Sequence, residues 1–171
     1  MRHQSVQGGF GFNGPVVHRN DDVSVFFRLV FESFQRAADA CGGSIEHTYL
    51  IGGCAVRLCF AGPALVPSIT PALAHVSADP YGCPELTVFL WDSTSSGVKM
   101  PPPPWGRDCY GPKGEIRGYN NDRFRTIVQM DSGILSFIDF ETKRALYWIH
   151  DARDIPSYEN GAPLLRIFNA W

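Results

Sequence analysis

Leu86-Thr87-Val88-Phe89-Leu90-Trp91 is a nearly continuous apolar run, and it ends at the polar pair Asp92-Ser93. Such a run is typical of a strand that is covered on both faces. The backbone changes direction after it, and residues 93–97 are predicted to form a polar turn whose hydroxyls bond to their own backbone. Pro101-Pro102-Pro103-Pro104 favours an extended, stiff segment that sets the distance of Trp105 from the sheet. We therefore expect residues 86–91 to be a central strand.

Residues 21–41 carry the clearest helical pattern of the chain. Asp21 and Asp22 suit the N-terminal end of a helix because their charge complements the helix dipole, and Gly42-Gly43 provides a C-terminal stop. The apolar residues that recur at helical spacing are Val23, Phe26, Phe27, Val30, Phe34, Ala37, Ala38 and Cys41. This spacing predicts a helix whose Phe-rich face packs on a sheet.

Gly52-Gly53 separates two strand-like segments, residues 49–51 and 54–60. Paired glycines readily take the positive φ angles of a two-residue turn, so the pattern predicts a β-hairpin. In the second segment Val56, Leu58 and Phe60 share one face. Arg57 lies on the other face, where it reaches solvent or an acidic partner.

The pattern of the second half of the chain predicts a meander of four antiparallel strands. The predicted strands are residues 115–119, 123–130, 134–139 and 143–149. Turn-forming residues connect them, including Asn120-Asn121-Asp122 and Asp131-Ser132-Gly133. Within the second strand, Phe124, Thr126, Val128 and Met130 alternate with Arg123, Arg125, Ile127 and Gln129, which predicts one core face and one mixed face.

Two further helices are predicted next to prolines. Thr70 can cap a short helix over residues 70–75, with Pro71 in its first position. Gly161-Ala162-Pro163 opens a C-terminal helix. The apolar stripe of that last helix consists of Leu164, Leu165, Ile167, Phe168 and Trp171.

These elements together predict an α+β fold. A mainly antiparallel sheet of about six or seven strands packs against the long N-terminal helix and is closed by the C-terminal helix. Residues 1–20 are glycine-rich and without a sustained period, so we expect them to be a flexible or irregular arm. Residues 21–171 are long enough to form a single α+β domain.

Composition narrows the classes of partner and location. The 15 Lys and Arg against 17 Asp and Glu give a net charge of −2, which disfavours nucleic acid as a partner. Five cysteines without a C-x-x-C pair favour reduced thiols and no metal site. The chain carries neither a secretory signal pattern nor an apolar run long enough to span a membrane, so we expect a cytoplasmic protein without a membrane partner.

Several blocks of sequence are distinctive. They include Tyr49-Leu50-Ile51-Gly52-Gly53, the segment from Val56 to Leu65, Trp91-Asp92-Ser93 with the following Pro-rich segment, Gly114-Glu115-Ile116-Arg117-Gly118-Tyr119-Asn120, and Tyr147-Trp148-Ile149-His150-Asp151-Ala152-Arg153. Together these blocks are similar to the region that precedes the kinase domain in bacterial HPr-kinase-related proteins. The resemblance covers residues 49–171. It implies a serine kinase domain of the HPr kinase and PEP carboxykinase type, supplied in cis or in trans, that would carry a phosphate-binding loop.

The chain itself lacks that loop. The pattern G-x-x-x-x-G-K-[ST] is absent, since no hydroxyl residue follows Lys113 in Gly111-Pro112-Lys113-Gly114. No catalytic residue of the family is carried over, and no cofactor is expected. The resemblance therefore implies a noncatalytic recognition or regulatory module that presents a peptide or protein substrate to a kinase domain.

Two sets of polar residues offer alternatives. Arg57, Arg117, Arg123 and Arg125 could converge across strands to grip a small anion, because the guanidinium fork suits oxyanions; the other interpretation is that they pair with Asp92, Glu115 and Asp122. Asp92, Ser93, His150 and Asp151 could form an enzymatic site of an unfamiliar kind, although the G-x-S-x-G elbow is missing. A stand-alone anion-binding protein and an enzyme thus remain the alternative functions.

Overall fold

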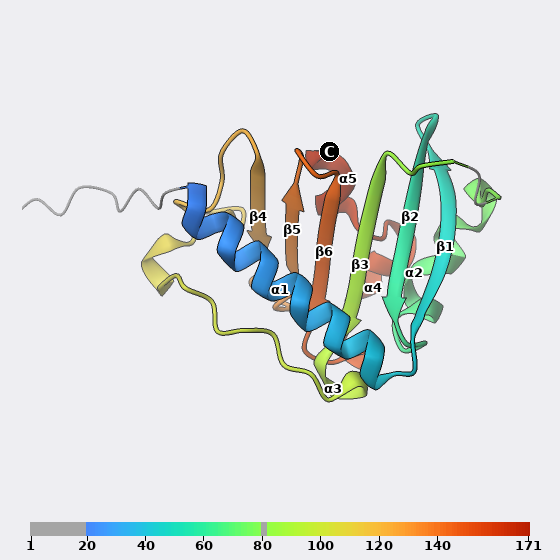
Figure 1. Ribbon diagram of the computed structural model, residues 1–171, viewed down its shortest axis with the longest axis horizontal. Coiled ribbons are helices and arrows are strands. Elements are labelled where there is room, and N and C mark those ends of the chain that lie inside the picture. The colour runs from blue at the N-terminus through green and yellow to red at the C-terminus, as the bar shows by residue number, and fades with distance from the viewer. Residues whose placement is uncertain (1–19, 80–81) are drawn as a thin grey trace, which may run out of the picture.

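The computed structural model describes residues 20–79 and 82–171 and places six strands in one sheet (Figure 1). The strands are β1 Ser44–Ile51, β2 Cys54–Ala61, β3 Leu86–Asp92, β4 Phe124–Val128, β5 Leu135–Asp139 and β6 Arg144–Ile149. The helices are α1 Asn20–Ala40, α2 Val66–Leu73, α3 Ser93–Ser96, α4 Ser157–Gly161 and α5 Leu165–Ala170. The predicted arm over residues 1–20 lies outside the described residues, apart from Asn20 at the start of α1.

The sheet is mostly antiparallel, which confirms the predicted α+β class. Its spatial order is β1-β2-β3-β6-β5-β4. The pairs β1–β2, β4–β5 and β5–β6 are antiparallel, whereas β2–β3 and β3–β6 are parallel. Strand β3 contains the apolar run 86–91 and lies between β2 and β6, so the predicted central strand is confirmed.

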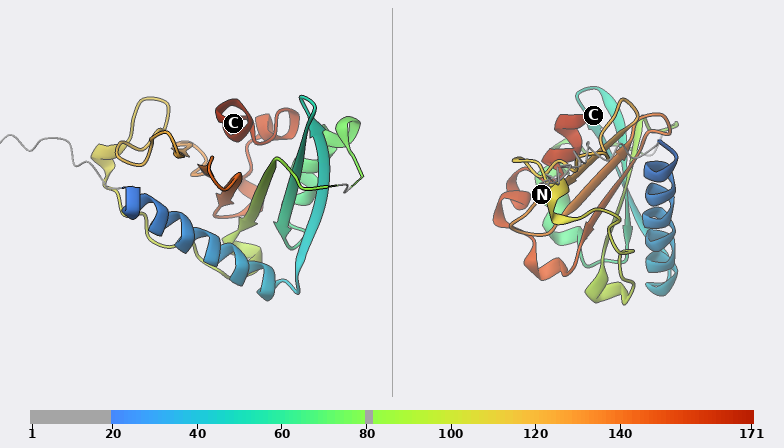
Figure 2. Two further views of the ribbon diagram at one scale, coloured as in Figure 1. Left: turned by 45° about the horizontal axis from the view of Figure 1, so that its top comes forward. Right: turned by 90° about the vertical axis from the view of Figure 1, so that its left-hand side faces the viewer.

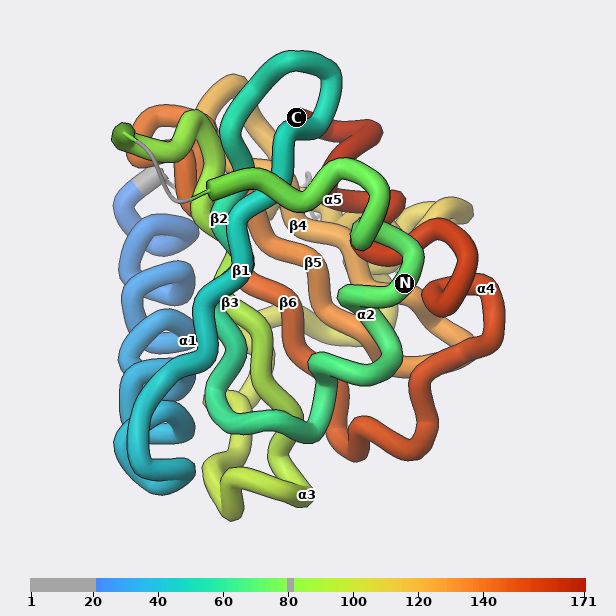
Figure 3. Tube along the Cα trace, turned by 90° about the vertical axis from the view of Figure 1, so that its right-hand side faces the viewer, coloured from blue at the N-terminus to red at the C-terminus, as the bar shows by residue number. Residues whose placement is uncertain are grey.

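Helices cover both faces of the sheet. Of these helices, α1 lies on one face, while α2, α4 and α5 lie on the opposite face (Figures 2 and 3). Strand β3 accordingly buries Leu86, Val88 and Leu90 toward the second group of helices and Trp91 toward α1. The strand is apolar along nearly its whole length because both of its faces are covered.

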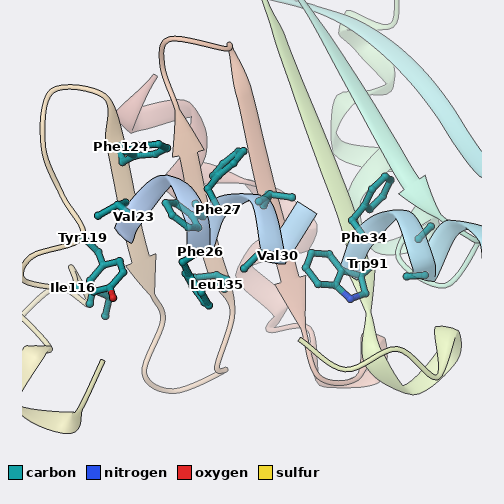
Figure 4. Packing of buried hydrophobic residues seen from close by; sticks show 14 of the residues in the cluster. Val23, Phe26, Phe27, Val30, Phe34, Trp91, Ile116, Tyr119, Phe124 and Leu135 are labelled. Atoms are coloured by element: carbon teal, nitrogen blue, oxygen red, sulfur yellow. The ribbon is translucent and has the colours of Figure 1, made fainter. Parts of the chain in front are cut away.

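The face of α1 that packs on the sheet is the one predicted from its spacing. The buried residues of the helix are Val23, Phe26, Phe27, Val30, Phe34, Ala37 and Ala38. Figure 4 shows part of this core, with Phe26 and Phe27 among the labelled residues. The ring centroids of Phe27 and Phe137 lie 4.9 Å apart, and those of Phe26 and Trp105 lie 5.1 Å apart. Each fully buried aromatic or aliphatic side chain contributes roughly 1.5–3 kcal/mol, so apolar packing holds α1 on the sheet.

The hairpin prediction is confirmed. Strands β1 and β2 pair around Gly52 and Gly53, which have φ angles of 58° and 87°. Both angles are positive, as a tight two-residue turn between right-twisted strands requires. Val56, Leu58 and Phe60 are buried together in the core beneath α2, as their alternation predicted.

The meander prediction was wrong in its first strand. Residues 115–119 form no strand and make only isolated bridges, such as Glu115 with Ile127. The reason is the side chain of Asn120, whose amide oxygen accepts from the Thr126 amide at 2.7 Å and whose amide nitrogen donates to the Ile116 carbonyl at 2.8 Å. This side chain replaces part of the backbone ladder that a strand would need. Met130, predicted in the core, is 68% exposed because β4 ends at Val128.

The helix predicted over residues 70–75 begins earlier, at Val66. Pro67 lies in its first turn and Pro71 lies inside it. Thr70 is therefore inside the helix and not at its N-terminal cap, and its hydroxyl donates back to the Val66 carbonyl at 2.9 Å.

The predicted turn over residues 93–97 is the one-turn helix α3, which Gly97 ends with a φ of 71°. Near the C-terminus, Gly161 closes α4 instead of opening the last helix.

Candidate functional site

The parallel pairing of β3 and β6 brings two of the predicted polar segments together. Asp92-Ser93 follow β3 and His150-Asp151 follow β6, and the carboxyl ends of the two strands lie at the same edge of the sheet. The amides of Ser93 and Thr94 both donate to the His150 carbonyl, at 3.1 and 3.0 Å. This edge is the position at which sheets with parallel strands commonly bind ligands.

The side chains of Asp92 and Ser93 are used within the fold. The Asp92 carboxylate accepts the Ser95 amide at 2.9 Å and also the Ser95 hydroxyl, and so caps α3. The hydroxyl of Ser93 accepts the indole N–H of Trp148 at 2.9 Å. His150 is exposed to solvent. The arrangement therefore gives Ser93 an indole donor and no imidazole base.

Asp151 is held by the residue two positions further along the chain. Its carboxylate accepts the Arg153 amide at 2.9 Å and the Arg153 guanidinium at 2.6 Å, and its side chain is 12% exposed. These hydrogen bonds, followed by the positive charge of Arg153, hold the pKa of Asp151 well below its usual range. Asp151 is consequently an ionised carboxylate, and it cannot serve as a proton donor near neutral pH.

A hollow of about 410 Å³ opens at this edge. We call it the Asp151 hollow; its polar lining consists of Ser68, Asp92, Thr94, Ser95, Asp151 and Arg153. Within residues 20–79 and 82–171, no three His, Cys, Asp or Glu side chains gather as a metal ion would require. The hydroxyls and the exposed guanidinium can contact a small polar ligand, while the hydroxyl–carboxylate contact between Ser95 and Asp92 belongs to the cap of α3.

The four arginines of the anion hypothesis lie at separate places. Arg57 meets Glu46 at 3.8 Å, and Arg117 donates to the Asp108 carbonyl at 2.8 Å. Arg123 lines a hollow beside α1, whereas Arg125 lines a different hollow beside α5, on the other side of the sheet. The acidic partners that the structure gives them are Glu46, Asp139 and Glu141, in place of the predicted Asp92, Glu115 and Asp122.

Sequence reasoning missed a hollow of about 490 Å³. We call it the Glu159 hollow; it lies between residues 112–114, residues 128–131 after β4, and helices α4 and α5. Gln129 and Glu159 are its most buried polar lining residues, 8% and 1% exposed. A glutamate in a short polar helix resembles any solvent-facing residue, so the sequence offers no signal for it.

Glu159 lies in a network of buried polar groups. Its carboxylate accepts the Leu164 amide at 2.8 Å and the Gln129 side-chain amide at 3.5 Å, while the Tyr158 hydroxyl donates to Gln129. Burial raises the pKa of Glu159 although these hydrogen bonds oppose the shift. Burial, and then the negative charge of Glu159, also raise the pKa of the neighbouring Tyr147. A buried carboxyl in a hollow is a recognised sign of a functional site.

Comparison with known proteins adds no relative, because no family model, no curated protein and no solved structure matches the chain. Among the described residues, no helix combines the length and the apolar character needed to cross a lipid bilayer.

Proposed function

We propose that this chain is a noncatalytic recognition or regulatory module that presents a peptide or protein substrate to a kinase domain, supplied in cis or in trans. The resemblance of residues 49–171 to the region before the kinase domain of HPr-kinase-related proteins motivates the proposal. One structural observation carries it. Three of the side chains that an enzyme would use at the ends of β3 and β6, those of Asp92, Ser93 and Asp151, are engaged in holding the fold.

The hydroxyl of Ser93 illustrates this engagement. A serine nucleophile needs an adjacent base that removes its proton, yet Ser93 accepts a hydrogen bond from Trp148 at 2.9 Å. The nearby carboxylates are also occupied, since Asp92 caps α3 and Asp151 binds Arg153. This pattern favours a scaffold over the alternative of an enzyme at this edge.

The experiment measures phosphorylation of the substrate protein by a purified HPr-kinase-type catalytic domain, with and without this chain. We expect the chain to raise kcat/KM for the protein substrate and to leave the KM for ATP unchanged. An unfolded sample of the chain serves as the control. No change in kcat/KM would refute the module, and binding of ATP or transfer of phosphate by the chain alone would contradict its noncatalytic nature.

A second candidate function is the binding of a small anionic ligand. It is favoured by a hollow of about 300 Å³ beside α1, which we call the Arg144 hollow; its lining includes Arg28, Arg123, Arg144, Phe31 and Asp139. The Arg144 guanidinium lies over the Phe31 ring at 5.3 Å and has no carboxylate partner among the described residues. Titration with inorganic phosphate should show binding that Arg144→Gln abolishes and Arg153→Gln leaves intact; absence of binding would remove this candidate.

We also propose two finer features. The chain acts in the cytoplasm, a proposal supported by its five unpaired cysteines, and cell fractionation tests it. Helix α5 and the preceding Leu164 close the hydrophobic core on the face of the sheet opposite α1, as the burial of Leu164 and Ile167 suggests. Ile167→Ala should lower the free energy of unfolding by about 2–5 kcal/mol if this is so.

A further inference from the structure

The Glu159 hollow combines a polar interior with an apolar rim. Met130, Tyr158 and Leu165 line it and are 68%, 45% and 47% exposed, so three large apolar side chains gather around one hollow. Buried Gln129 and Glu159 lie beneath them. Ligand sites typically pair apolar walls with a few convergent polar groups in this way, and about 490 Å³ falls within their usual range of roughly 300–1,000 Å³.

Glu159 lacks a cationic partner. Among the described residues no Lys, Arg or His lies within ion-pair distance of its carboxylate, whose hydrogen-bond partners are the neutral groups of Leu164, Gln129 and Tyr147. An ionised carboxylate that is removed from water is costly unless it meets a positive charge. A ligand with an ammonium group would supply that charge.

The lining of the hollow also includes two cationic residues. Lys113 and Arg166 line the hollow together with one exposed carboxylate, Asp131, so these three exposed residues carry a net positive charge. Arg166 lies near enough to Glu159 for its charge to favour the ionised carboxylate. A ligand carboxylate can contact these two cations while its ammonium contacts Glu159.

We propose that the Glu159 hollow binds a zwitterion with an apolar side chain, with its ammonium on Glu159 and Gln129, its carboxylate on Arg166 and Lys113, and its side chain between Met130 and Leu165. A free α-amino acid and a short peptide with both termini free share this chemistry. They differ in the distance between the two charges. The proposal is independent of the kinase-module function, since it concerns a different ligand and a binding readout.

Calorimetric titration of the full chain with L-leucine and with L-leucyl-L-leucine tests the proposal. We expect one of the two to bind at millimolar concentration or below, and the better ligand identifies the charge separation that fits. N-acetyl-L-leucine lacks the ammonium and L-leucinamide lacks the carboxylate. Because each analogue lacks one of the two charges, we expect it to bind about ten- to a hundredfold more weakly than L-leucine.

Matched variants assign each charge. Glu159→Gln keeps the shape of the side chain and should weaken leucine binding about tenfold or more, while Arg166→Gln should weaken leucine but leave leucinamide unchanged. Arg153→Gln, in the Asp151 hollow, is the control and should bind normally. Thermal denaturation verifies that each variant is folded. Absence of binding by both ligands to the folded wild-type chain, or equal binding of leucine and N-acetyl-L-leucine, would overturn the proposal.

Discussion

Arg123 and Asp139 form a bidentate ion pair, with Nε to Oδ1 and Nη2 to Oδ2 both at 2.9 Å, which ties the start of β4 to the end of β5. The Asp139 side chain is only 3% exposed, whereas that of Arg123 is 37% exposed. Asp139→Asn should lower the free energy of unfolding by about 1–3 kcal/mol, less than for a fully buried pair because water still reaches Arg123. Urea denaturation measures the change.

Glu141 provides the matched control for this pair. It contacts the same guanidinium at 2.6 Å, but its side chain is 67% exposed. Glu141→Gln should therefore change stability by about 0.5 kcal/mol or less. If Asp139→Asn proved as mild as Glu141→Gln, the bidentate pair would have no special role in the sheet.

The same ion pair predicts a loss of stability in acid. Burial acts to raise the pKa of Asp139, but hydrogen bonds from Arg123 and Thr142 outweigh it and leave the pKa lowered in the folded chain. The stabilisation is therefore present above the unfolded pKa of about 3.9 and lost as pH falls through the folded pKa. The stability difference between wild type and Asp139→Asn, measured by denaturation from neutral pH downward, should shrink below about pH 4.

The raised pKa of Glu159 predicts that its contribution to stability changes with pH in the opposite direction. Burial raises its pKa above the ordinary 4.5, so between 4.5 and the folded pKa the folded chain holds a proton that the unfolded chain has released. Wild-type stability should fall as pH rises through this window, while Glu159→Gln should lack that part of the slope. Denaturation curves collected across the window compare the two slopes. Parallel pH profiles for both proteins would contradict a raised pKa.

Ser93→Ala distinguishes a structural serine from a catalytic one. The substitution leaves the Trp148 indole N–H without its partner, so stability should drop by about 1 kcal/mol. Exposed Ser157 is the control, and Ser157→Ala should stay within about 0.5 kcal/mol of wild type. Denaturation gives both values. A hydrolytic activity that disappears in Ser93→Ala without loss of stability would favour the enzyme instead.

Gly114 should be the least replaceable of the tested turn glycines. Its φ is +85°, and a Cβ there would clash with the Val128 carbonyl oxygen. Gly133 has a φ of +70° but open space around it. Gly133→Ala should cost about 1–2 kcal/mol from the backbone conformation alone, and Gly114→Ala about 2–4 kcal/mol because the clash adds to it. Thermal denaturation of both variants measures the two losses of stability. Equal losses at Gly114 and Gly133 would contradict the predicted clash.

Local periodicity predicted the elements whose residues interact mainly with near neighbours or with one covering layer. The spacing of α1, the paired glycines between β1 and β2, and the apolar run of β3 each match the structure. The sequence did not reveal where a side chain would replace a backbone group as a hydrogen-bond partner. The Asn120 amide takes hydrogen bonds that a strand over residues 115–119 would have used, and sequence spacing does not reveal which partner such an amide chooses.

Residue spacing and composition were enough to predict the α+β class, the central strand and the polar residues at the ends of β3 and β6. Which of those residues meet depended on how the strands pair and pack in three dimensions. Parallel pairing joined Asp92-Ser93 to His150-Asp151, while opposite faces of the sheet separated Arg123 from Arg125. Tertiary packing also buried Glu159, because desolvation depends on what α4 packs against, and a residue's position along the chain carries no record of that environment.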